Sequence, residues 1–163
     1  MRDESKVTYL NILIDSLKKK ENLLLKLKTE TLKQEEIIGQ QEFNADRFDE
    51  TLNAKQAYIE ELLKTDEGFM EIYEKIKDDL KTNASDYRSE IETAKALIKK
   101  QTEMSIELQT LESKNQTGLQ IHLSKGKQKV RDFNANSKTV AAYYKNMTNH
   151  HQEGDSYFFN REK

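Results

Sequence analysis

The strongest constraint on the fold is a 4-3 repeat of residues that runs without interruption through the middle of the chain. Side chains at this spacing share one face of a helix. The phase survives Thr65-Asp66-Glu67-Gly68, where a turn would reset it, so the repeat predicts one helix over about residues 46–81. The alternative is two helices broken at Gly68. The residues of the repeat are Phe48, Leu52, Lys55, Ile59, Leu62, Asp66, Phe69, Tyr73, Ile76 and Leu80.

Two further apolar patterns of the same kind flank this segment. They predict helices over about residues 6–38 and 86–125. Gly39 suits a helix C-terminus, and Asn44 or Asp46 suits the next N-cap. Asn83 and Ser85 are the corresponding caps before the third helix. The first pattern consists of Val7, Leu10, Leu13, Ile14, Leu17, Leu24, Leu27, Ile37 and Ile38, and the second of Tyr87, Ile91, Ala94, Ile98, Gln101, Met104, Leu108, Leu111 and Leu119.

The composition fits long helices joined by few connections. The chain has no Pro, no Cys and 5 Gly, with 34% charged and 35% hydrophobic residues. So small an apolar fraction is ordinary for an elongated bundle with a narrow apolar seam. We therefore predict an all-α fold: an elongated antiparallel three-helix coiled-coil bundle over residues 1–130, followed by a partly ordered or helical C-terminal tail over residues 131–163.

The tail carries large apolar side chains after the repeat has ended. Val140, Tyr143, Tyr144 and Met147 lie at i, i+3, i+4 and i+7, on one helical face. Tyr157, Phe158 and Phe159 form a second short cluster. Aromatic side chains are frequent anchors of protein interfaces, so these seven residues are candidates for binding a partner. The alternative is that both clusters fold back and cover the bundle's own core.

No pattern typical of an enzyme is present. Phosphate-binding glycine loops, zinc-protease motifs and cysteine-based metal spacings are all missing, so we expect no catalytic residue, no metal and no cofactor. The basic stretch KGKQKVR is too short to predict nucleic-acid binding. The first residues hold no apolar run long enough for a signal peptide or membrane span. We expect a cytoplasmic protein that does not insert into membranes.

Three stretches resemble the FlgN-type chaperones of flagellar export. They are the leucine-rich LNILIDSLKKKENLLLKLKTE, the acidic EEIIGQQEFNADRFDETLNAKQAYIEELLK and the following DEGFMEIYEKIKDDL. The resemblance covers roughly residues 7–115, and YYKNM with HHQEGDSYFF is similar to the tail of such proteins. The basic, Asn-rich character of the tail departs from that pattern and leaves the client's identity open.

The resemblance implies a cytoplasmic, non-enzymatic chaperone. Its clients would be hook-associated proteins of the hook–filament junction, bound through a terminal helix before type III secretion, and its further partners would include components of the export gate. The chain would be a monomer or weak dimer. A FliT-like chaperone of the filament cap is built on similar lines and is one alternative. The other is a structural coiled-coil scaffold protein without a cargo, whose apolar positions would be covered by copies of itself.

Overall fold

The computed structural model describes residues 3–124 and 142–146, and every regular element among them is helical. This confirms the all-α fold and its three long helices. Residues 142–146 form a further short helical segment. The long helices are α1 (Glu4–Ile38), α2 (Ala45–Thr82) and α3 (Arg88–Ser124), and a short 3-10 helix, η1 (Ala84–Tyr87), precedes α3.

The helix ends follow the capping residues closely. The Asp3 carboxylate accepts a hydrogen bond from the backbone N–H of Ser5 at 2.9 Å and caps α1, which ends at Gly39 as predicted. The side chain of Asn44 caps α2 by accepting from the N–H of Arg47 at 3.1 Å. The prediction of the third helix was less accurate. Ser85 lies within η1, and α3 itself begins only at Arg88.

α2 is one continuous helix of 38 residues, which confirms that the unbroken phase of the repeat outweighs the turn-like composition around Gly68. Gly68 is exposed, and a Cβ added there would have no neighbour within 4 Å. Gly118 of α3 is different because a Cβ there would lie 2.6 Å from the Cγ2 of Ile38. The first glycine is tolerated by the helix, whereas the second permits α1 and α3 to approach closely.

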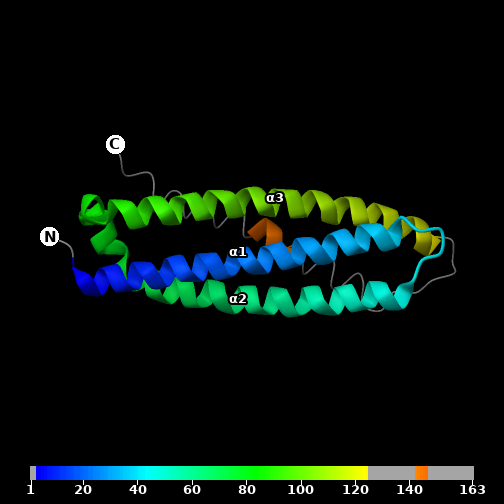
Figure 1. Ribbon diagram of the computed structural model, residues 1–163, viewed down its shortest axis with the longest axis horizontal. Coiled ribbons are helices and arrows are strands. Elements are labelled where there is room, and N and C mark those ends of the chain that lie inside the picture. The colour runs from blue at the N-terminus through cyan, green and yellow to red at the C-terminus, as the bar shows by residue number, and fades with distance from the viewer. Residues whose placement is uncertain (1–2, 125–141, 147–163) are drawn as a thin grey trace.

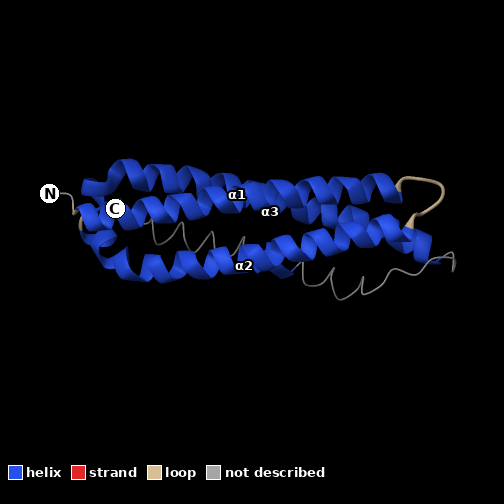
Figure 2. Ribbon diagram, turned by 60° about the horizontal axis from the view of Figure 1, so that its bottom comes forward, coloured by secondary structure: helices blue, strands red, loops and turns tan. Residues whose placement is uncertain are grey.

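The helices run up, down and up, and in the view of Figure 1 α1 is drawn between the other two. The backbone of α1 packs closely along both α2 and α3, whereas the backbones of α2 and α3 stay farther apart. Side chains of all three helices nevertheless meet in common apolar clusters, which agrees with the predicted shared seam. Figure 2 shows the long helices from a second direction, in which they again run side by side.

α1 and α3 are parallel and keep one register along their length. Four hydrogen bonds join a side chain of Tyr87 or α3 to the main chain of Asp3 or α1, and in each of them the residue numbers differ by 84. Successive members of the series 87, 101, 115 and 122 are separated by whole heptads, so one face of α3 follows α1 throughout. The pairs are Asp3 with Tyr87, Leu17 with Gln101, Thr31 with Asn115, and Ile38 with His122, at 2.6 to 3.4 Å.

Three ion pairs repeat at the same heptad interval along the edge of this interface. Each one alone contributes little because exposed ion pairs are screened by water. Their polarity alternates, however, so a slip of one heptad in either direction would bring Glu opposite Glu and Lys opposite Lys. The pairs are Glu21 with Lys100 at 3.0 Å, Lys28 with Glu107 at 2.7 Å, and Glu35 with Lys114 at 3.4 Å.

Buried apolar side chains form four clusters along the bundle. The ends are closed by aromatic residues, with Tyr87 at one end and Phe43 packed on Phe48 and His122 at the other. The cluster at the middle, which we call the central cluster, combines residues of all three long helices with two residues of the segment 142–146. It contains Leu23, Leu24, Leu27, Ile59, Leu62 and Leu108 together with Tyr143 and Tyr144.

The two glycines give a matched pair of substitutions. We expect Gly68→Ala to stabilise the protein by about 0.5–1 kcal/mol, because alanine restricts the unfolded chain and meets no obstacle in the helix. Gly118→Ala should destabilise it by about 1–3 kcal/mol, because the Ile38 side chain has to move. Urea-induced unfolding followed by circular dichroism measures both, and shifts of the same sign would contradict the assigned surroundings.

Candidate helix-docking site

The segment of residues 142–146 lies at mid-length of the bundle, beside α1 and α3 (Figure 1). Tyr143 and Tyr144 are buried, with exposed fractions of 7% and 0%, whereas Ala142, Lys145 and Asn146 are exposed. The rings of Tyr143 and Tyr144 meet edge to face, with centroids 6.1 Å apart. The segment thus binds the bundle through two adjacent aromatic side chains.

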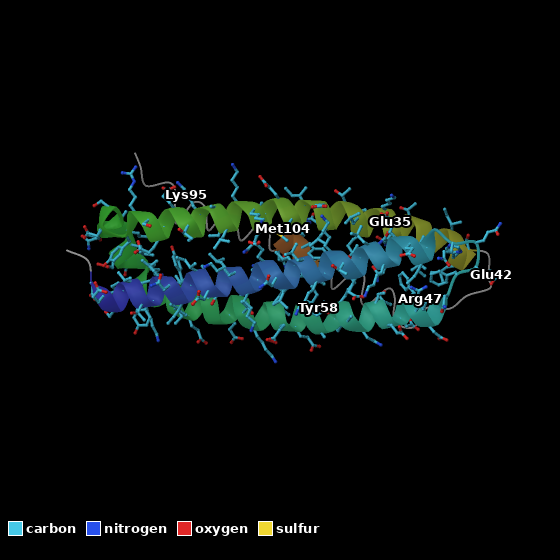
Figure 3. All side chains as sticks on the ribbon, viewed as in Figure 1. Glu35, Glu42, Arg47, Tyr58, Lys95 and Met104 are labelled. Carbon is cyan, nitrogen blue, oxygen red and sulfur yellow. The ribbon has the colours of Figure 1, made fainter. Side chains whose placement is uncertain are left out.

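All three long helices contribute to the pocket for these rings. α1 supplies three leucines, Leu23, Leu24 and Leu27, and the others supply the remaining members of the central cluster. Tyr58 of α2 and Met104 of α3, both labelled in Figure 3, pack against this cluster as well. Because the backbones of α2 and α3 stay farther apart than either is from α1, the segment can reach the core between them.

Tyr143 is held by a polar contact to α2. Its hydroxyl donates to Oδ2 of Asp66 at 3.0 Å, and Oδ1 of Asp66 accepts from Nζ of Lys20 at 2.7 Å. Burial raises the pKa of Tyr143, and the charge of Asp66 raises it further. Burial lowers the pKa of Lys20, while Asp66 opposes that change. The three groups form a chain in which one carboxylate is shared by an ammonium and a phenol.

Tyr144 is held through its main chain by α3. Its carbonyl oxygen accepts from the hydroxyl of Ser105 at 3.0 Å and from Nε2 of Gln109 at 3.3 Å. Burial raises the pKa of the Tyr144 phenol well above its ordinary value, and the nearby charge of Glu112 adds to this effect. Tyr143 therefore contacts α2 by its side chain, while Tyr144 contacts α3 by its backbone, so the segment bridges the two outer helices.

A second buried lysine lies beneath Tyr144. Lys55 of α2 pairs with Glu112 of α3 and also donates to Oε1 of Gln34 at 2.9 Å. The Thr31 hydroxyl donates to the Leu27 carbonyl at 2.7 Å and lies 3.3 Å from the same carboxylate. Burial lowers the pKa of Lys55, against the influence of Glu112. The pair links α2 and α3 directly, in addition to their apolar contacts in the central cluster.

The sequence prediction for the tail divides into two parts. Tyr143 and Tyr144 pack within their own bundle, as the fold-back alternative describes. Val140, Met147, Tyr157, Phe158 and Phe159 lie outside the described residues. Binding of a partner by any of the seven stays a prediction.

Sequence reasoning missed the pocket residues Lys20, Ser105, Gln109 and Glu112. A signal for two of its polar members was present, because Lys55 and Asp66 occupy positions of the 4-3 repeat where apolar residues are usual. A third, Lys20, continues the spacing of Leu13, Leu17, Leu24 and Leu27, although it stands in a run of three lysines that reads as surface.

Two features are absent from the described residues. Within residues 3–124 and 142–146, no set of three or more His, Cys, Asp or Glu side chains is placed to hold a metal ion. No helix in those ranges has an apolar stretch sufficient to cross a membrane. The buried ammonium groups of Lys20 and Lys55 are paired with Asp66 and Glu112.

Comparisons with protein-family models, with curated proteins and with solved structures found no match to this chain.

The buried pair of Lys55 and Glu112 gives a stability prediction. We expect Glu112→Gln to destabilise the protein by about 3–5 kcal/mol, because it leaves a buried ammonium without its counter-charge. The double change Lys55→Met with Glu112→Leu should recover most of that loss, because it removes both charges. Denaturant unfolding measures the free energies. As the control, Glu74→Gln removes the exposed partner of Lys77 and should be nearly silent. Equal effects from the two Glu→Gln changes would contradict the assigned burial.

The two tyrosines predict a loss of stability at alkaline pH. A tyrosine with a raised pKa in the folded chain contributes stability that is fully present below the unfolded pKa of about 10 and is lost as the pH rises toward the folded value. We expect the unfolding free energy to fall above about pH 10, by up to roughly 1.4 kcal/mol per pH unit for each tyrosine. The lowered pKa values of Lys20 and Lys55 act in the opposite direction below about pH 10.4.

The comparison that isolates the tyrosines is the double variant Tyr143→Phe with Tyr144→Phe, which keeps both lysines. Its unfolding free energy should fall less steeply between about pH 10 and 11 than that of the original chain. Urea titrations at several pH values provide the slopes. Identical slopes would show that these phenols are not buried in the folded protein.

Proposed function

We propose that this protein is an export chaperone of the FlgN type, which holds a terminal helix of a hook-associated protein before flagellar type III secretion. The observation that carries the proposal is the docking site between α2 and α3, where a short helical segment with two aromatic anchors is bound. Amphipathic helices are commonly recognised in this way, with apolar anchors inserted in a groove between helices. The similarity of residues 7–115 to this class of chaperone, noted from the sequence, supports the same reading.

In this proposal a client helix takes the place of residues 142–146. The segment buries two rings and makes polar contacts to Asp66, Ser105 and Gln109. A contact of this size is small compared with a stable protein interface, so exchange with a client is energetically feasible. A client bound through equally few contacts would also leave readily, as delivery to an export gate requires.

The arrangement of the core favours a cargo-binding protein over a coiled-coil scaffold. The central cluster and the three others are buried by residues of a single chain, so a second copy is not needed to cover them. The large apolar side chains that are exposed are only partly so, and they are distributed over all three long helices. A FliT-like chaperone of the filament cap would use the same kind of site and would differ in its client.

The experiment is a calorimetric titration of the full-length protein with synthetic peptides of the terminal helices of hook-associated proteins and of the filament cap protein. If a client replaces residues 142–146, the double variant Tyr143→Ala with Tyr144→Ala should bind its client more tightly, by about tenfold or more. Lys145→Ala is the matched control, because this residue is exposed in the same segment, and it should leave the affinity unchanged.

Each possible result has a distinct meaning. Preference for a hook-associated peptide supports the FlgN-type assignment, and preference for the cap peptide supports the FliT-like alternative. Binding that the double variant weakens would show that the two tyrosines contact the client directly, as the sequence alone suggested. No binding of any peptide by either protein would refute the chaperone proposal.

A further inference from the structure

We infer that the docking site selects a hydroxyl group on the first of its two aromatic anchors. The partner that fits it is a helix carrying a tyrosine, followed directly by a second large aromatic residue. The inference deepens the proposed function, and rests on it, in so far as a client binds where residues 142–146 bind. The inference states which side chains the bound helix must carry, and does not state which protein that helix belongs to.

The two carboxylate oxygens of Asp66 bind different partners. One carboxylate oxygen accepts from Lys20 at 2.7 Å, and the other accepts from the Tyr143 hydroxyl at 3.0 Å. The side chain of Lys20 is only 7% exposed, so the ion pair fixes the position of the carboxylate at the edge of the pocket. A phenylalanine in place of Tyr143 would fill the pocket equally well but would leave the second oxygen without this donor. A glutamate or aspartate there would be repelled by the same carboxylate.

The second anchor is held in a different way. Ser105 and Gln109 donate to the carbonyl oxygen of Tyr144, which a residue of any type would supply. The Tyr144 side chain is fully buried in the central cluster, with Thr31 beside its phenol. Selection of a hydroxyl group is therefore inferred only at the Tyr143 position, where the acceptor is a charged carboxylate.

The solvent exposure of Asp66 sets the size of the expected effect. Its side chain is 36% exposed, so water can replace part of a lost hydrogen bond. A fully enclosed site that reads a hydroxyl rejects the analogue without it by about 10⁴-fold or more. For a hydrogen bond to a charged group that water reaches, a preference of about fivefold to twentyfold is expected.

The test uses the full-length chain with Tyr143→Ala and Tyr144→Ala, in which the internal anchors are removed while the bundle residues are kept. The probe is a fluorescent peptide of residues 138–150, KTVAAYYKNMTNH, added in trans and followed by fluorescence anisotropy. A second peptide carries Tyr143→Phe, and a third carries Lys145→Ala as the control. We expect the Phe peptide to bind about fivefold to twentyfold more weakly than the original, and the control peptide to bind equally.

A second variant protein, which lacks Asp66, tests whether Asp66 causes the preference for the tyrosine hydroxyl. Adding Lys20→Met with Asp66→Leu replaces the ion pair by apolar residues, a change that buried pairs commonly tolerate. On this background the Phe peptide should bind at least as tightly as the original, because the hydroxyl has lost its acceptor. A Phe peptide that binds the first background as tightly as the original overturns the inference. It is also overturned if the original peptide fails to bind, or if the preference persists without Asp66.

These results are independent of the proposed function because the probe is a segment of this chain. A hydroxyl preference together with no binding of flagellar peptides would uphold the site's chemistry and refute the chaperone proposal. Binding of a flagellar peptide without any hydroxyl preference would support the chaperone proposal and refute the inference about the hydroxyl group.

Discussion

The fixed register between α1 and α3 is the constraint on which the rest of the structure depends. The backbones of α2 and α3 do not approach closely, so their alignment depends largely on α1, which packs along both, with support from side-chain contacts such as the Lys55–Glu112 pair. The series of polar contacts at a separation of 84 residues holds that alignment from one end of the bundle to the other. The alternating ion pairs add a penalty for the nearest wrong alignments. Apolar packing alone would discriminate poorly here, because leucines one heptad apart are nearly equivalent.

The buried lysines have a different role from the register contacts. A buried ion pair is rarely more stable than apolar residues of similar volume, because two charges must be removed from water. Lys20 and Lys55 nevertheless stand in the core on either side of the central cluster, each with one carboxylate. Ion pairs are directional, whereas apolar contacts are not. The two lysines therefore fix the positions of the Asp66 and Glu112 carboxylates beside the two tyrosines. Both buried lysines and their carboxylate partners thus belong to the site where residues 142–146 dock.

The long helices were predictable because their signals are local and repeated. The phase across Gly68, the end at Gly39 and the cap at Asn44 each follow from a few neighbouring residues, and all three agree with the structure. The docking of Tyr143 and Tyr144 was left undecided, since it depends on residues of three helices that are far away in the chain. Periodicity identifies an apolar face in the tail but contains no information on what covers that face. The resemblance to a chaperone family described a class of protein and likewise did not specify the pocket.

The spacing of the register contacts along α1 and α3, in steps of 14, 14 and 7 residues, has a consequence for how such a chain can change its length, because every step is a whole number of heptads. A single inserted residue in α1 or α3 would rotate everything beyond it by about 100° and remove the following contacts from their partners. Removing one heptad from each of the three helices would instead preserve every remaining neighbour. Relatives of this protein that share its register should therefore differ in helix length by whole heptads, while the connections at Gly39 to Asn44 and at Asn83 are free to vary by single residues.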